Sequence, residues 1–349
     1  MTKLPLACLV VAGLVATHSR AEAGWIGWNW QTSHFANPFT KNQTASNIVR
    51  VPSNPSKQTL LVFLPGTGED NESFTEFLDA AANHGYYAIA LDYRHGEHVP
   101  NLVGCWPTGA AQLYEQQVRG VDNQFFPWDN DLSFPSINSV NYRLGAILQV
   151  LQNEQPAGTN VDWMQFWNAT AEKPAWSKIV IAGHSQGGST AGWILKNEGA
   201  KAGLIFEGMF DRLSIAATEI NTTYSPLPVF PADCFGAFGD NTPSWTTPGA
   251  WVQRMLLVSD KFSTVYSGSP GKHIAATAVA IGKTHERHLT GAPSAIDYSW
   301  YTIDDAGCGA HGAPIVNQAN CQTPIAWRAD FWGALLERVP SLATNVPWQ

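Results

Sequence analysis

Short apolar runs alternate along this chain with longer segments in which apolar residues recur every three or four positions. The continuous apolar runs predict buried strands over 59–64, 86–93, 178–182, 202–206, 254–258 and 300–303. The amphipathic segments predict helices over 73–84, 138–153, 187–197 and 329–338. A run at 47–51 predicts an antiparallel strand ahead of the others. Strands separated by helices predict an α/β fold, with a mainly parallel sheet covered on both faces.

Two long segments, at about 95–136 and 207–253, break this alternation. Both are rich in Gly, Pro and aromatic residues. Long connections of this kind usually line or cover a site, and ordinary surface decoration is the alternative. No repeat, low-complexity tract or charge block marks a linker, so residues 24–349 are predicted to form a single domain with two insertions.

The N-terminus has the pattern of an export signal. Lys3 precedes an apolar stretch from Leu4 to Ala16, and Ala21-Glu22-Ala23 offers a cleavage site. The pattern predicts a signal peptide over residues 1–23, cleaved near Ala23, and hence a secreted or periplasmic protein. No other stretch reaches the ~18 apolar residues that span a bilayer, so we expect no stable membrane anchor.

Composition excludes two classes of protein. Hydrophobic residues make up 44% of the chain and charged residues 14%, whereas a disordered chain needs few hydrophobic residues and a high net charge. The net charge is −8, and no cluster of Lys and Arg could contact phosphates, so we expect no nucleic-acid partner.

Four cysteines remain once the signal peptide, with its Cys8, is removed. An even number in an exported protein favours disulfides, and four cysteines allow three connectivities. We favour Cys308–Cys321, which closes a short local loop, and then by elimination Cys105–Cys234. Four buried thiols are the alternative, and the absence of a C-x-x-C pair disfavours zinc.

The strongest chemical signal is the motif G-x-S-x-G at residues 183–187. It lies between the apolar run at 178–182 and the helical pattern at 187–197, which is the context that makes the motif specific. A serine at a sharp strand-to-helix turn has a strained backbone, and side chains at Gly183 and Gly187 would collide. The helix N-terminus supplies N–H groups to a developing oxyanion. The motif therefore predicts Ser185 as a nucleophile.

These residues resemble the α/β-hydrolase superfamily, in the manner of its secreted serine esterases and lipases. The resemblance rests on GHSQGG at 183–188, on LPGTG at 64–68 and on the strand order around them. It implies an α/β-hydrolase fold with insertions near the active-site edge, and a triad in the chain order Ser, acid, His. It predicts the mechanism better than the substrate.

The resemblance also implies two backbone donors for the oxyanion. Gln186 follows the nucleophile and matches the first donor, while Thr67, after Gly66, matches the second by position. Pro65 replaces the histidine that is common there, which is a departure. A plain glycine turn is the alternative interpretation of this segment.

The triad acid is expected after a late strand. Asp260 directly follows the apolar run at 254–258 and is the favoured residue. Asp211 is the second candidate, with Glu207 behind it, because both follow the run at 202–206.

The base is expected after the acid, which leaves His273, His285, His288 and His311. His311 lies in a glycine-rich loop after the run at 300–303 and before the last helix, where the family usually carries its base. The segment 283–288 is interpreted as an exposed helix end. A Cys308–Cys321 bridge would brace the loop that carries His311.

The sequence thus predicts a secreted serine hydrolase that cleaves carboxylic esters through Ser185, Asp260 and His311 and an acyl-enzyme intermediate. No cofactor or metal is expected, because no phosphate loop, dinucleotide motif or H-E-x-x-H pattern occurs. Aromatic, carbohydrate-linked and polymeric esters all remain open as substrates, since many tryptophans lie in or near the insertions: Trp106, Trp128, Trp163, Trp167, Trp176, Trp245 and Trp251. A serine peptidase and a non-catalytic binding protein are the alternatives.

Overall fold

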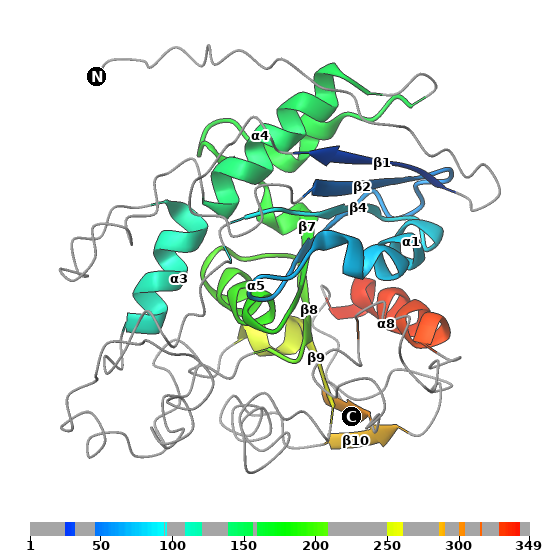
Figure 1. Cartoon of the computed structure of the whole chain (residues 1–349), viewed down its shortest axis with the longest axis vertical. Coiled ribbons are helices and arrows are strands. Elements are labelled where there is room, and N and C mark those ends of the chain that lie inside the picture. Colours follow the sequence, from blue (N-terminus) through cyan, green and yellow to red (C-terminus); the bar gives the residue numbers. More distant parts are fainter. Residues whose placement is uncertain are drawn as a thin grey trace.

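The computed structural model describes residues 25–31, 46–93, 95, 109–120, 139–155, 159–208, 250–260, 286–289, 300–303, 315 and 328–342 (Figure 1). Over these residues the chain forms a sheet in the order β1-β2-β4-β3-β7-β8-β9-β11-β10. Its members are β1 (Trp25–Gln31), β2 (Ser46–Pro52), β3 (Leu60–Leu64), β4 (Tyr87–Ala90), β7 (Ile179–His184), β8 (Ala202–Phe206), β9 (Met255–Asp260), β10 (Glu286–Leu289) and β11 (Trp300–Ile303).

The sheet is mainly parallel, as the alternation of elements predicts. The antiparallel pairs are β1 with β2 and β2 with β4, and every neighbouring pair from β4 to β10 is parallel. The predicted antiparallel strand at 47–51 is therefore confirmed as β2. Because parallel strands end at the same edge, the loops that follow β3, β7, β8, β9 and β11 all begin there.

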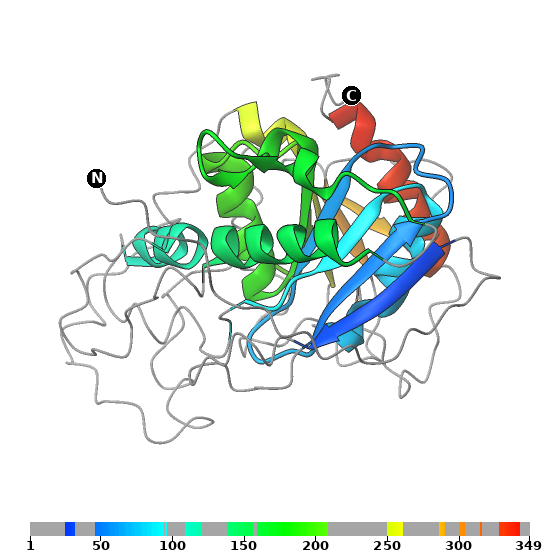
Figure 2. The same ribbon diagram turned by 90° about the horizontal axis from the view of Figure 1, so that it is seen from above.

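Alternate residues of each strand point to opposite faces, and each face has its own helices. On one face, Leu60, Val62 and Leu64 pack with α3 (Gly109–Arg119), α4 (Val140–Asn153) and α5 (Gln186–Asn197). On the other, Leu61 and Phe63 pack with α1 (Thr75–Asn83) and α8 (Arg328–Leu342). The sheet seen from above lies between these two groups of helices (Figure 2). Burial on both faces explains why the strands read as continuous apolar runs.

Short elements fill the connections. Four 3-10 helices, η2 (Asn71–Phe74), η5 (Trp163–Phe166), η6 (Trp176–Lys178) and η9 (Ala250–Arg254), and a small hairpin of β5 (Trp167–Asn168) and β6 (Lys173–Pro174) belong to the described chain.

Three regions differ from the sequence prediction. The segment interpreted as a helix end at 283–288 contains β10, which pairs with β11, so that interpretation is wrong. The insertion at 95–136 contains the helix α3. The sequence analysis does not predict the edge strand β1, which pairs with the next strand along the chain, β2.

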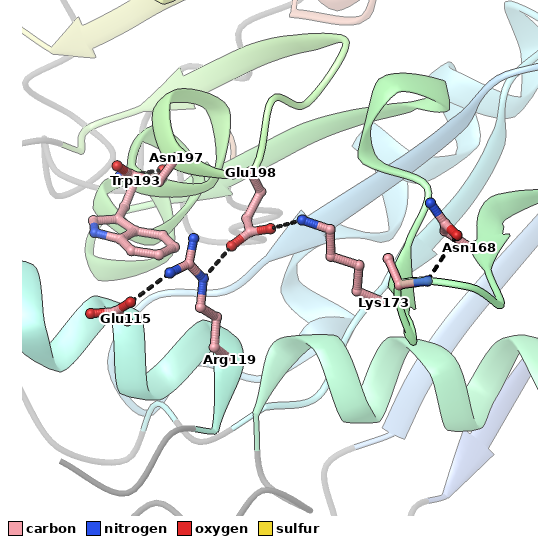
Figure 3. A network of polar contacts seen from close by, with 8 residues as sticks. Glu115, Arg119, Asn168, Lys173, Trp193, Asn197 and Glu198 are labelled. Atoms are coloured by element: carbon pink, nitrogen blue, oxygen red, sulfur yellow. Dashed lines mark hydrogen bonds and ion pairs between the residues drawn. The ribbon is translucent and has the colours of Figure 1, made fainter.

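The insertion helix α3 is joined to the C-terminal end of α5 by ion pairs (Figure 3). The guanidinium of Arg119 lies 2.5 Å from carboxylate oxygens of both Glu115 and Glu198. Lys173, from the β5–β6 hairpin, reaches the other oxygen of Glu198 at 2.8 Å. Arg119 also lies over the ring of Trp193, 5.2 Å from its centre. One carboxylate thus connects α3, α5 and the hairpin.

Residues 1–23 and all four cysteines of the predicted disulfides, Cys105, Cys234, Cys308 and Cys321, lie outside the described residues. Among the helices that are described, none is both long and apolar enough to cross a bilayer.

Candidate active site

Ser185 occupies a sharp turn between β7 and α5. Its backbone has φ +53° and ψ −122°, a conformation that L residues rarely adopt. Its N–H donates to the Phe206 carbonyl of β8 at 2.9 Å, and its own carbonyl accepts from the Ser189 N–H at 3.1 Å. The surrounding strand and helix therefore hold the strained backbone in place, which is the situation expected at a functional residue.

The two glycines of the motif make this turn possible. A Cβ on Gly183 would collide with the carbonyl group of Gly187, and a Cβ on Gly187 would collide with the carbonyl oxygens of Leu64 and Pro65. The absence of a side chain at Gly187 lets the segment after β3 lie directly against the start of α5.

The turn after β3 lies beside the serine. A Cβ on Gly66 would lie 2.8 Å from the Cβ of Ser185. Thr67 Oγ1 donates to Gln186 Oε1 at 2.6 Å, so the two residues predicted to supply the oxyanion donors are in direct contact. Within the described part of the chain, the backbone N–H of Thr67 has no hydrogen-bond acceptor. Gln186 begins α5, where N–H groups point out of the helix end.

Sequence reasoning missed Glu69. Its Oε2 accepts the Gly66 N–H at 2.6 Å and lies 2.9 Å from Nδ1 of His184, the residue before the nucleophile. His184 is fully buried. No local pattern marks a glutamate that contacts a histidine 115 positions away.

Buried polar residues also contact the turn after β3. Tyr93 donates its hydroxyl to the Pro65 carbonyl at 2.9 Å, and the Gly68 N–H donates to the His95 carbonyl at 2.9 Å. Asp92 and Arg143 form a buried ion pair at 3.0 Å. Burial lowers the pKa of His95, although the nearby carboxylates of Asp92 and Glu69 act in the opposite direction.

The predicted triad partners are described only in part. Asp260 is the last residue of β9, which lies two strands from β7 in the sheet, and its side chain is not described. His311 and the alternative acid Asp211 lie outside the described residues, as do His273 and His285. The backbone of His288 lies in β10.

Glu207, the remaining acid candidate, directly follows β8. It is fully buried with φ +49°, and its N–H donates to the Val258 carbonyl at 2.8 Å. The carboxyl ends of β7, β8 and β9 share one edge of the sheet, so Glu207 and the backbone of Asp260 lie at the same edge as Ser185.

The tryptophans of the insertions divide into two groups. Trp163, Trp176 and Trp251 are buried in the core, and Trp167 packs against it. Trp106, Trp128 and Trp245 lie outside the described residues. Most of the tryptophans that can be placed therefore serve packing. Among the described residues, no group of three or more His, Cys, Asp or Glu side chains could hold a metal ion.

No family model and no curated protein sequence matches this chain. Among solved structures it is similar to an S-formylglutathione hydrolase from Agrobacterium tumefaciens, at 13% identity and a TM-score of 0.42 over 95% of this chain and 99% of the other. It is similar to esterase B from Lactobacillus rhamnosis, at 11% identity and a TM-score of 0.45 over 92% and 88% of the two chains.

A third similar structure is a puromycin-hydrolyzing peptidase of Mycobacterium tuberculosis, at 15% identity and a TM-score of 0.42, with 95% of this chain covering 41% of that one. A mainly parallel sheet, and a strained serine at the turn from β7 to α5, give the chain the α/β-hydrolase fold.

Proposed function

We propose that this chain is a serine hydrolase that cleaves carboxylic esters, with Ser185 as nucleophile, His311 as general base and Asp260 as the acid that orients the imidazole. One observation carries the proposal. Ser185 has a left-handed backbone at the start of α5 and lies against a turn whose Thr67 N–H has no acceptor among the described residues. A strained serine beside unused backbone donors is what acyl transfer needs.

In the proposed reaction, Ser185 Oγ attacks the ester carbonyl while His311 takes the hydroxyl proton. The carbonyl oxygen becomes an oxyanion that accepts hydrogen bonds from the N–H groups of Thr67 and Gln186. Collapse of this intermediate breaks the ester bond, and His311 gives the proton to the leaving alcohol. Water then attacks the acyl-enzyme by the same steps and releases the acid.

The decisive experiment is the Ser185→Ala variant, tested with a fluorophosphonate probe and an ester panel. We expect labelling to disappear and ester turnover to fall by at least about 10³-fold. The melting temperature should change little, because the substitution removes one hydroxyl. Ser189→Ala, which changes a buried serine one turn further along α5, is the matched control and should keep labelling.

The panel also separates the alternatives. It should vary acyl length, aromatic character and attachment to sugars or polymers, and it should include peptide amides. Preferential amide cleavage would indicate a serine peptidase. A wild-type protein that neither reacts with the probe nor turns over any ester would indicate a non-catalytic binding protein and would refute the proposal.

The triad partners need their own test. His311→Ala should lower kcat by about 10³-fold or more, and Asp260→Asn should lower it heavily but less. His288→Ala serves as the matched control for the base. If Asp211→Asn or Glu207→Gln is crippling while Asp260→Asn is mild, the acid follows β8 instead of β9.

The export expectations also remain proposals. A signal peptide over residues 1–23 predicts a mature N-terminus near Gly24, which sequencing of the secreted protein would determine. The bridges Cys308–Cys321 and Cys105–Cys234 would be identified by peptide mapping without reduction. If the first bridge braces the loop of His311, replacing both of its cysteines by serine should lower activity.

A further inference from the structure

Glu69 joins the turn after β3 to the turn that carries the nucleophile. Its Oε2 accepts the Gly66 N–H at 2.6 Å, while its own N–H donates to the Gly66 carbonyl at 3.2 Å. The same carboxylate lies 2.8 Å (Oε1) and 2.9 Å (Oε2) from His184 Nδ1. One side chain thus closes its own turn and fastens it to the last residue of β7.

This contact lies next to the reacting atoms. A Cβ placed on Gly66 would lie 2.6 Å from Glu69 Oε2 and 2.8 Å from the Cβ of Ser185, so the carboxylate and the nucleophile border the same point. The His184 side chain is fully shielded from solvent and that of Glu69 is 25% exposed. Hydrogen bonds to a charged group in such surroundings are stronger than neutral ones in water.

Both neighbours of Ser185 hold this turn. His184, before the serine, contacts Glu69, and Gln186, after it, accepts from the Thr67 hydroxyl. Because Glu69 takes up the Gly66 N–H, that group is not available to an oxyanion, whereas the next N–H along the chain, that of Thr67, keeps no acceptor among the described residues. The two contacts therefore leave the Thr67 N–H, and not the Gly66 N–H, as the donor that this turn could offer to an oxyanion.

We propose that Glu69 is a positioning residue for the oxyanion hole: by binding the Gly66 N–H and the His184 imidazole together, it sets the distance between the Thr67 N–H and Ser185. This inference rests on the proposed function. An oxyanion donor acts only when it lies within hydrogen-bond distance of the developing charge. A displacement of ~1 Å in a catalytic group can lower a rate about 100-fold.

Positioning and charge predict different results for two variants. Glu69→Ala removes both contacts, so we expect kcat to fall about 10- to 100-fold with KM changed by less than about threefold. Glu69→Gln keeps an oxygen that can accept the Gly66 N–H, so it should recover most of the lost kcat. Glu72→Ala, which removes an exposed carboxylate three residues further on, is the matched control and should match the wild type.

A second measurement needs no turnover. In the Ser185→Ala background, hydrogen exchange of the peptide covering residues 64–69 should be faster in Glu69→Ala than in Glu69→Gln or Glu72→Ala. This readout also separates the two proposals: if Ser185→Ala retains the ester turnover of the wild type, the proposed function fails, and hydrogen exchange still decides whether Glu69 holds the turn.

Two results would overturn the role of Glu69. One is a kcat for Glu69→Ala within about twofold of the wild type, with unchanged hydrogen exchange. The other is a Glu69→Gln variant as impaired as Glu69→Ala, which would mean that the negative charge matters and the geometry of the acceptor does not. If Glu69→Ala does not fold, the test is the comparison of Glu69→Gln with Glu72→Ala. The kcat of Glu69→Gln must then lie within about threefold of that of Glu72→Ala.

Discussion

The two ends of α5 carry polar contacts of very different character. At the N-terminal end, Gln186 and His184 are almost fully buried and contact the turn after β3. At the C-terminal end, the Glu198 side chain is only 1% exposed, but its partners Arg119 and Lys173 are 37% and 41% exposed. The distances are similar, so distance alone does not separate the two sets. The exposure of the partners does, because water screens the partly exposed cations of Arg119 and Lys173 and competes for them.

From this difference we infer that the polar contacts at the two ends of α5 have different roles. Water competes less with the contacts at the buried end, so we expect them to hold the turn after β3 more firmly. At the other end, the ion pairs of Glu198 join the insertion helix α3 and the β5–β6 hairpin to α5 (Figure 3). Substitutions at the two ends should therefore differ in their effects on activity more than in their effects on stability.

The largest effect is expected at Gly187. Gly187→Ala places a methyl group into the carbonyl oxygens of Leu64 and Pro65, and backbone cannot give way as a side chain can. We expect the free energy of unfolding to fall by about 3 kcal/mol or more, and probe labelling of Ser185 to be lost. Urea unfolding and fluorophosphonate labelling measure these effects.

Gly68→Ala is the comparison for that variant. Gly68 also has a special conformation, with φ +67°, but a Cβ there meets nothing within 4 Å. Only backbone strain remains, so the loss of stability should be about 1 kcal/mol. Equal losses for the two variants would show that crowding around Gly187 adds little to the cost of its substitution.

A loss of similar size is expected at the buried ion pair of Asp92 and Arg143. In Arg143→Met, Asp92 loses this ion pair in a site where the two side chains are only 2% and 4% exposed. Breaking a buried pair by removing one partner typically costs about 3–5 kcal/mol, because the remaining charge stays buried with less compensation. Urea unfolding measures the loss in the free energy of unfolding. A loss below about 1 kcal/mol would contradict the expectation that this buried ion pair is needed for stability.

His95 should make the protein sensitive to mild acid. Burial lowers the pKa of its ring. In the folded protein the His95 ring therefore stays unprotonated at a pH where the same ring in the unfolded chain, with a pKa of about 6.5, binds a proton. The unfolded state then binds more protons, and stability falls as the pH drops through about 6.5. Urea unfolding between pH 8 and pH 5 should therefore have a smaller slope with pH in His95→Gln than in the wild type. Equal slopes would refute this assignment.

The smallest effect is expected at the exposed end of α5. Arg119→Ala removes two partly exposed ion pairs and the contact with Trp193, while Lys173 still binds Glu198. We expect a loss of about 1 kcal/mol that shrinks with added salt, and an unchanged kcat. A fall in kcat beyond about fivefold would mean that α3 contributes to the active site. It would contradict the different roles inferred for the two ends of α5.

Local patterns in the sequence determined a large part of this protein. Runs such as 60–64 and 202–206 are buried on both faces of a sheet, and that alone makes them apolar throughout. The strained turn at Ser185 was predictable because its strand, its glycines and its helix are adjacent in the chain.

Only the tertiary structure decided how distant segments meet. Residues 286–289 form a strand because β11 lies beside them, and no pattern within the segment contains that information. Thr67 and Gln186 are 119 positions apart, and Glu69 and His184 are 115 apart. Hydrophobic periodicity encodes which face of an element is buried, whereas the partner of a polar side chain depends on where the crossovers place it. The serine could therefore be predicted from the sequence, but the glutamate that holds its neighbouring turn could not.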